Sequence, residues 1–93
     1  MAWQVEMIRR RAAAGLVPFL RFCWDEFPPR DPRSIRPSQW PDSDDLEGTQ
    51  RLRKMALVTF HPDRNIRFCN KEDRGDGWLS FCTEICSHLN VAS

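Results

Sequence analysis

The sequence contains no tyrosine, only four glycines, and no apolar segment close to the roughly 20 residues that span a bilayer. We therefore expect no membrane association. A formal net charge of +1 is too small for a general nucleic-acid-binding domain, which usually carries a strong positive excess. The start of the chain also lacks the uninterrupted apolar stretch of a secretory signal. The four cysteines are therefore expected to be free thiols in a reducing compartment.

The residues that are present fit one small globular domain. The chain has 93 residues, of which 41% are hydrophobic and 29% are charged, close to the globular average. Four tryptophans and six phenylalanines predict a largely aromatic core. We expect a cytoplasmic location, with the nucleus as a second possibility. The run Arg9-Arg10-Arg11 and the alanines after it have only a weak similarity to an organelle-targeting peptide.

Helical spacing and proline positions divide the first half of the chain. Two helices are expected over residues 3–14 and 16–27, with Gly15 and Pro18 interrupting them. The apolar residues of the first do not share one face, whereas those of the second recur at helical spacing. Five prolines between residues 28 and 41 exclude a helix there. This segment is predicted to be an extended surface connector in which one residue, Trp40, contacts the core.

A third helix is expected over residues 42–60, with Asp42 or Ser43 as its N-cap. Pro62 ends it, because the residue before a proline is pushed out of the α region. On this helix Arg51 and Lys54 lie opposite an apolar arc, and Arg53 projects into that arc. The arc consists of Leu46, Leu52, Ala56, Leu57 and Phe60.

A polar loop is predicted over residues 64–75, followed by a last helix over 77–91 that Asp76 would cap. The apolar faces of the two long helices need partners, and each provides one for the other. We therefore expect an all-α fold without strands, in which these helices form an antiparallel pair. The tripeptide His61-Pro62-Asp63 would be exposed at one end of the pair. The stripe on the last helix consists of Trp78, Phe81, Cys82, Ile85 and Leu89.

Two neighbouring segments of the chain together resemble a J domain, the signature module of DnaJ-type co-chaperones. The similarity is carried by a basic helix that ends in an aromatic residue, by His-Pro-Asp, by Arg-Asn, and by an amphipathic helix after a loop. It identifies the chain as a divergent, eukaryotic-looking member and assigns residues 16–91 to the J domain and 1–15 to an N-terminal helical extension. The residues that match are Arg53, Lys54, Met55, Ala56, Leu57, Phe60, His61, Pro62, Asp63, Arg64 and Asn65.

The sequence departs from the family pattern at several points. One extra residue separates Ala56-Leu57 from His61, and the connector before the third helix is longer than usual. Thr59 stands where a basic residue is common. The last helix has no match to the family's alanine-tyrosine pair. These departures make the degree of retained activity the open question for this chain.

The resemblance implies a co-chaperone without catalytic chemistry or a cofactor of its own. Such a domain docks on a DnaK-type 70-kDa heat-shock chaperone and stimulates its ATP hydrolysis, which aids protein folding. Client proteins would be bound by regions outside this chain. An alternative is a degenerate J-like interaction module that does not stimulate the ATPase. The implied partner-binding residues are His61, Pro62, Asp63, Arg51, Arg53, Lys54, Arg64 and Asn65.

Physical reasons connect the tripeptide to docking. Pro62 fixes φ, so less conformational entropy is lost when a partner binds. Asp63 offers a carboxylate that suits a bidentate arginine, and His61 can donate or accept a hydrogen bond. Basic residues nearby would steer the chain toward an acidic surface. The simpler interpretations are a helix stop followed by a turn for the tripeptide, and a solvated helix face for Arg51, Arg53 and Lys54.

Three other classes of function are disfavoured. A zinc site at Cys82, Cys86 and His88 lacks the required spacing, because His88 points about 120° from Cys82 and about 160° from Cys86 on a helix. Acidic residues around the basic patches dilute the field that nucleic acid would need. An enzyme is disfavoured because His61 and Asp63 have no nucleophile beside them, and the chain has no glycine-rich phosphate loop.

Overall fold

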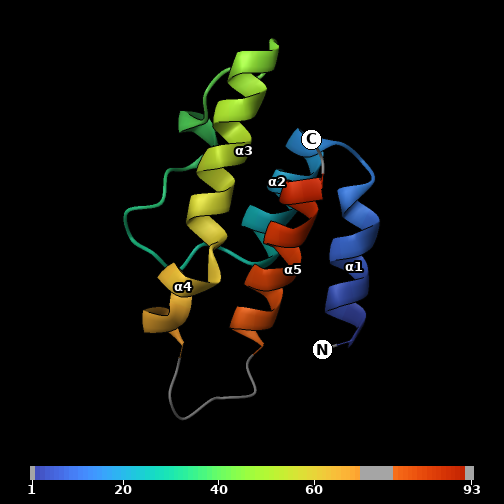
Figure 1. The fold of residues 1–93 in the computed structure, drawn as a ribbon, viewed down its shortest axis with the longest axis vertical. Coiled ribbons are helices and arrows are strands. Elements are labelled where there is room, and N and C mark those ends of the chain that lie inside the picture. The colour runs from blue at the N-terminus through green and yellow to red at the C-terminus, as the bar shows by residue number, and fades with distance from the viewer. Residues whose placement is uncertain (1, 70–76, 92–93) are drawn as a thin grey trace.

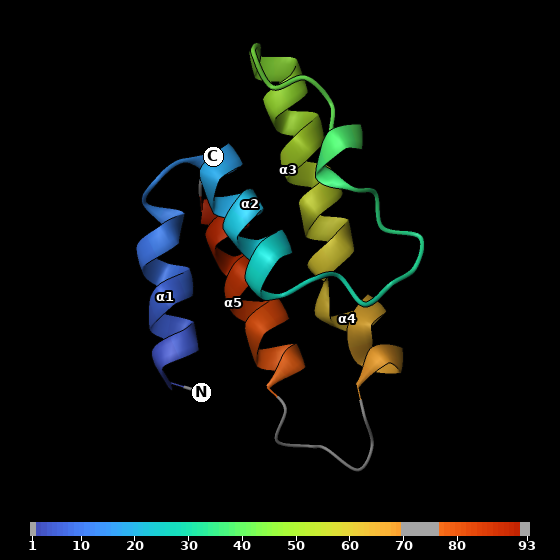
Figure 2. The same ribbon diagram turned by 180° about the vertical axis from the view of Figure 1, so that it is seen from behind.

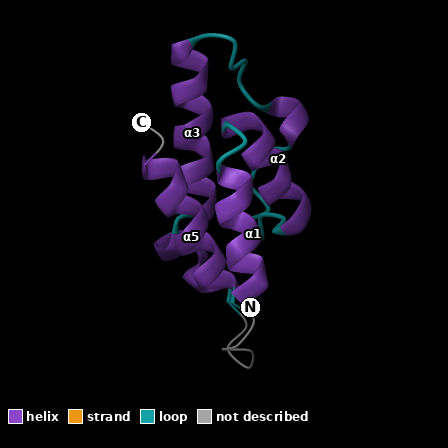
Figure 3. Cartoon of the chain, turned by 90° about the vertical axis from the view of Figure 1, so that its right-hand side faces the viewer, coloured by secondary structure: helices purple, strands orange, loops and turns teal. Residues whose placement is uncertain are grey.

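The computed structural model describes residues 2–69 and 77–91, and within these ranges the chain is all-α, as predicted (Figures 1 and 3). Short 3₁₀ turns occupy Pro37–Gln39 and Ile66–Phe68. The helices are α1 (Ala2–Ala12), α2 (Leu16–Glu26), α3 (Leu46–Phe60), α4 (Pro62–Asn65) and α5 (Trp78–Val91). None of them is long and apolar enough to cross a membrane.

The helices form a bundle around α5. In Figure 1, α3 descends and α5 rises beside it, so the two long helices are antiparallel as expected. Helix α1 flanks α5 on the side away from α3, and α2 lies behind α5, as the reverse view in Figure 2 shows. The connector between α2 and α3 runs along the outer side of α3. The end of α3 that carries His61 is therefore at the same end of the bundle as the start of α5.

The core is one continuous cluster that is rich in aromatic side chains. The ring of Trp24 meets those of Trp40 and Phe60 edge to face, with centroids 5.1 and 5.2 Å apart. A second contact joins Phe27, which follows α2, to Phe81 of α5, with ring centroids 4.7 Å apart. The predicted aromatic core and the predicted contact of Trp40 with it are both confirmed.

Helix α1 belongs to this core through Ile8, which the periodicity did not single out, and Met7 and Ala12 pack against the same cluster. Ile8 is fully buried, and α1 packs against both α2 and α5. On the solvent side of the contact, the Arg9 Nε donates to the Glu84 carboxylate at 3.0 Å. Helix α1 lies at the outside of the bundle, and only one narrow face of it is covered by α2 and α5. Its other apolar residues therefore need not share that face.

The predicted start of the third helix was four residues too early. Asp45, not Asp42 or Ser43, is the N-cap, and its carboxylate accepts from the Gly48 N–H at 2.6 Å. The Asp42 side chain instead accepts from the Asp44 N–H and holds a turn before the helix. With the helix starting later, Leu46 sits in its exposed first turn rather than in the core.

The predicted polar loop was wrong over its first part. The chain forms α4 from Pro62 to Asn65 and continues into a 3₁₀ turn over Ile66–Phe68. Proline is favoured at the first helical position because its missing N–H would be unpaired there anyway. The rest of the expected loop and the expected N-cap Asp76 lie outside the described residues.

A candidate docking site at the end of α3

His61 and Pro62 join α3 to α4. His61 is the C-cap of α3 and the N-cap of α4, and its Nδ1 accepts from the Asp63 N–H at 3.2 Å. Pro62 follows at the first position of α4. His61 and Asp63 are exposed, and Pro62 is half-buried. The tripeptide thus lies at the surface with its backbone held by the His61–Asp63 bond, and the Asp63 side chain is available to a partner.

Asn65 has a structural position that the sequence analysis did not anticipate. It was expected to contact a partner, but it is only 1% exposed. Its Nδ2 donates to the carbonyl oxygens of Thr59 and His61, at 3.0 and 2.8 Å. Its Oδ1 accepts from the indole N–H of Trp78 at 3.2 Å. Asn65 therefore ties the end of α3 to the start of α5 and is not accessible to a partner.

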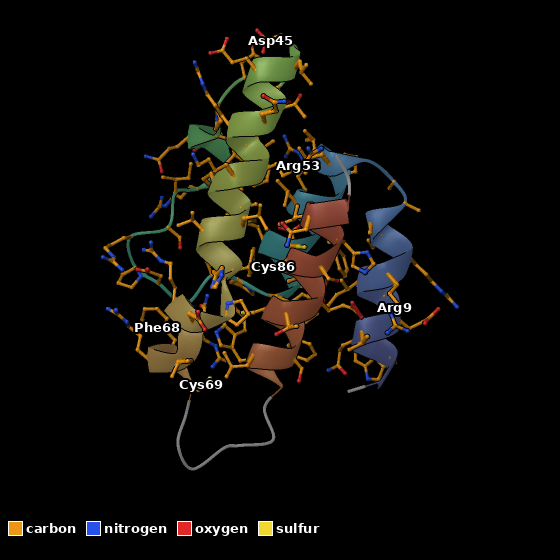
Figure 4. All side chains as sticks on the ribbon, viewed as in Figure 1. Arg9, Asp45, Arg53, Phe68, Cys69 and Cys86 are labelled. Carbon is orange, nitrogen blue, oxygen red and sulfur yellow. The ribbon has the colours of Figure 1, made fainter. Side chains whose placement is uncertain are left out.

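The basic residues of α3 do not form one group. Arg51 and Lys54 are exposed, and Arg51 is paired with Glu47 one turn away. Arg53 is half-buried, and within the described chain its buried Nε has no hydrogen-bond partner. Figure 4 places Arg53 on the side of α3 that faces α2 and α5, toward the end opposite α4. Arg53 therefore does not extend the surface that carries Asp63.

The connector supplies charged residues that the sequence analysis missed. The guanidinium of Arg30 lies over the Trp78 ring, 4.4 Å from its centroid, and donates to the Phe68 carbonyl at 2.9 Å. The next residue, Asp31, pairs with Arg33 at 3.0 Å and with Arg64 at 3.8 Å. The residue types of a proline-rich connector do not predict such contacts. The contacts depend on how the connector passes α3 and α4.

The charge of Asp31 is fixed by these neighbours. Hydrogen bonds from the Arg33 side chain and backbone, together with the field of Arg64, lower the pKa of Asp31 to about 2. The carboxylate is therefore ionised throughout the physiological range. Its side chain is only 10% exposed, whereas those of Arg33 and Arg64 are 66% and 48% exposed. Solvent consequently meets the two arginines rather than the acid between them.

A pocket of about 160 Å³ opens between the connector and α3, beside Arg64. Its apolar lining comes from Ile35, Met55 and Val58, and Asp31, Arg33 and Arg64 provide its charged side chains. A larger depression of about 430 Å³ lies between α1 and α5, and its lining includes Glu84, which already pairs with Arg9. The pocket near Arg64 is therefore a concave surface close to the tripeptide, since Arg64 directly follows Asp63.

The cysteines are placed as inert core residues rather than as ligands. Burial raises the pKa of Cys23 and Cys82 to about 12 and that of Cys86 to about 11, so these thiols are neutral at pH 7. All four cysteines are free, and Cys69 is half-buried near the end of α4 (Figure 4). In the described ranges, no three histidine, cysteine or acidic side chains are grouped so that they could hold a metal ion.

Comparison of the chain with protein-family models, with curated proteins and with solved structures finds no match. The geometry of the chain's own residues is therefore the basis for a functional proposal.

Proposed function

We propose that the chain is a co-chaperone that docks on a DnaK-type 70-kDa heat-shock chaperone and stimulates its ATP hydrolysis. The observation that carries the proposal is the position of His61-Pro62-Asp63 at one end of an antiparallel helix pair, with His61 and Asp63 exposed. The chain itself needs no nucleophile or cofactor for this role. It acts by binding more tightly to the conformation of the chaperone that hydrolyses ATP than to the conformation that does not.

Each exposed residue has a distinct part in this proposal. Asp63 offers both carboxylate oxygens to an arginine of the chaperone. His61 holds the backbone at Asp63, since its Nδ1 accepts the Asp63 N–H and His61 is the N-cap of α4. Arg64 adds positive charge beside Asp63, and Lys54 is an exposed lysine farther along α3, whereas the charge of Arg51 is balanced by Glu47. Asn65 contributes indirectly by holding the α3–α4 corner against Trp78.

The test is a single-turnover ATPase assay with a DnaK-type chaperone. We expect the wild-type chain to accelerate hydrolysis and Asp63→Asn to reduce that acceleration at least tenfold. His61→Gln should also reduce it, because the ring that positions residue 63 is lost. Asp44→Asn is the matched control, since Asp44 is an exposed acid at the far end of α3. Equal stimulation by all four proteins, or none by the wild type, would falsify the proposal.

A second candidate is an interaction module that binds a partner without stimulating ATP hydrolysis. It is favoured by one feature, the hydrogen bond from the Asp63 N–H to His61, which uses one ring nitrogen of His61 within the chain itself. If the chain is such an interaction module, the wild type would bind the chaperone in a pull-down or in calorimetry. The single-turnover rate of ATP hydrolysis would nevertheless stay at the level of the chaperone alone.

A further inference from the structure

The pocket between the connector and α3 combines an apolar floor with a cationic rim. Ile35, Met55 and Val58 supply apolar surface, and Val58 is 43% exposed. The Thr59 hydroxyl also lines the pocket, but it already donates to the Met55 carbonyl at 2.8 Å. Because that hydroxyl proton is used internally, the floor suits an apolar group better than a polar one.

The size of the pocket limits what can enter it. A cavity of about 150 Å³ holds a benzene-sized molecule. The pocket, at about 160 Å³, is therefore large enough for one leucine-sized side chain and too small for a folded element. Such a side chain would lie against Val58 and Met55 while its backbone ran across the opening.

The rim selects for negative charge. Arg33 and Arg64 are largely exposed, whereas the acid between them is covered. Both guanidiniums keep donors beyond those directed at Asp31, and a planar guanidinium binds carboxylates in a fork geometry. Lys54 lies one helical turn before Val58, so the positive surface continues along α3. A segment with carboxylates on both sides of its apolar residue would complement this arrangement.

The pocket wall is held in place before any ligand arrives. The indole N–H of Trp24 donates to the Ile35 carbonyl at 3.1 Å, and Trp24 is itself buried in the core. The Arg33 N–H donates to the Asp31 carboxylate at 2.9 Å. These bonds hold the connector wall of the pocket, so less conformational entropy remains to be lost on binding.

We propose that this pocket binds an extended acidic segment of the chaperone partner, with one apolar side chain between Ile35, Met55 and Val58 and carboxylates on Arg33 and Arg64. The inference rests on the proposed function, because Arg64 directly follows the tripeptide and a partner at Asp63 would reach the pocket. The connector is then part of the docking surface, and Arg33 is one of its determinants.

The first experiment uses a fluorescein-labelled peptide, GEDLDEG, and the chain without a chaperone. Fluorescence anisotropy should show saturable binding that Arg33→Glu and Val58→Glu each weaken at least fivefold. Arg21→Glu is the matched control, because Arg21 is an exposed arginine of α2 that does not line the pocket. A peptide with glycine in place of leucine should bind at least threefold more weakly. Binding that neither pocket variant changes overturns the inference.

The second experiment measures docking on the chaperone and its ATPase with the same proteins. Arg33→Glu should raise the Kd for the chaperone at least fivefold and leave the maximal stimulation at saturation near the wild-type level. An unchanged Kd also overturns the inference. If the wild-type chain gives no stimulation, the proposed function fails, while the peptide assay still reports on the pocket independently. Circular dichroism and urea titration verify folding, and Val58→Ser with Arg33→Gln replace any charged variant that does not fold.

Discussion

At the scale of single residues, five consecutive positions contain both the side chains offered to a partner and the buried side chain that holds them in place. His61, Pro62 and Asp63 lie at the surface, and Asn65 is buried beneath them. The sequence placed Asn65 among the partner contacts because it follows the tripeptide. One signal pointed the other way, since a buried tryptophan needs a hydrogen-bond acceptor and Trp78 was predicted to be in the core. The signal did not indicate which acceptor would be used.

Replacing Asn65 with alanine should destabilise the fold by about 2–4 kcal/mol. The change removes two donors from the Thr59 and His61 carbonyls and one acceptor from the Trp78 indole, all in a buried place. Urea unfolding followed by circular dichroism measures the loss. Asp63→Asn, two residues away and exposed, should stay within about 0.5 kcal/mol of the wild type. Equal effects of the two substitutions would mean that the Asn65 bonds are not formed in solution.

Ion pairs around the connector show why residue identity alone did not reveal the candidate pocket. Asp31, Arg33 and Arg64 are separated by up to 33 positions in sequence, yet they meet at one place. Their charges were visible in the sequence, and their proximity was not. Proximity arises because the connector crosses the end of α3 instead of extending into solvent.

At the scale of elements, the sequence located the longer helices well, except for the start of α3. Periodicity located α2 and α5 to within one residue at each end. The start of α3 was misplaced because several acidic residues in a row could each serve as its N-cap. The capping residue was decided by the turn that Asp42 forms and by the close approach of that turn to Gly48.

Gly48→Ala should destabilise the chain by about 1–3 kcal/mol, which is an overpacking cost. Helix propensity alone predicts the opposite sign, a gain of about 1 kcal/mol. The reason is steric, because a Cβ on Gly48 would lie 1.6 Å from the Asp42 carbonyl oxygen. Thermal unfolding measures the sign. Gln50→Ala, an exposed site in the same helix, serves as the control, and a stabilised Gly48→Ala would show that the turn is not packed on α3.

At the scale of the whole molecule, α1 is packed into the same core as the helices that carry the tripeptide. Its residue Ile8 joins the cluster that includes Leu20, Leu52 and Ile85. Residues 1–15 were assigned to an extension because the resemblance covers only residues 16–91, and the apolar positions of the first helix gave no indication of how it packs. The tertiary structure gives the segment a role as a cover for α5 and α2.

Ile8→Ala should cost about 2–4 kcal/mol, because it removes buried methyl and methylene groups and leaves a cavity. The effect should appear as a lower midpoint in one cooperative unfolding transition, with α3 and α5 unfolding together with α1. Arg10→Ala on the exposed side of α1 is the control and should change stability by no more than about 0.5 kcal/mol. An Ile8 variant as stable as the control would show that α1 does not contribute to the core.

The sequence by itself determined the all-α class, the approximate positions of α1, α2, α3 and α5, the aromatic core and the antiparallel pairing of the two long helices. These follow from hydrophobic periodicity and from proline, which act over a few neighbouring residues. Only the tertiary structure decided that Asn65 is buried, that Arg53 lies apart from Asp63, and that the connector forms a pocket with α3. Those outcomes depend on which distant segments approach one another, and a linear pattern of residues does not encode such distances.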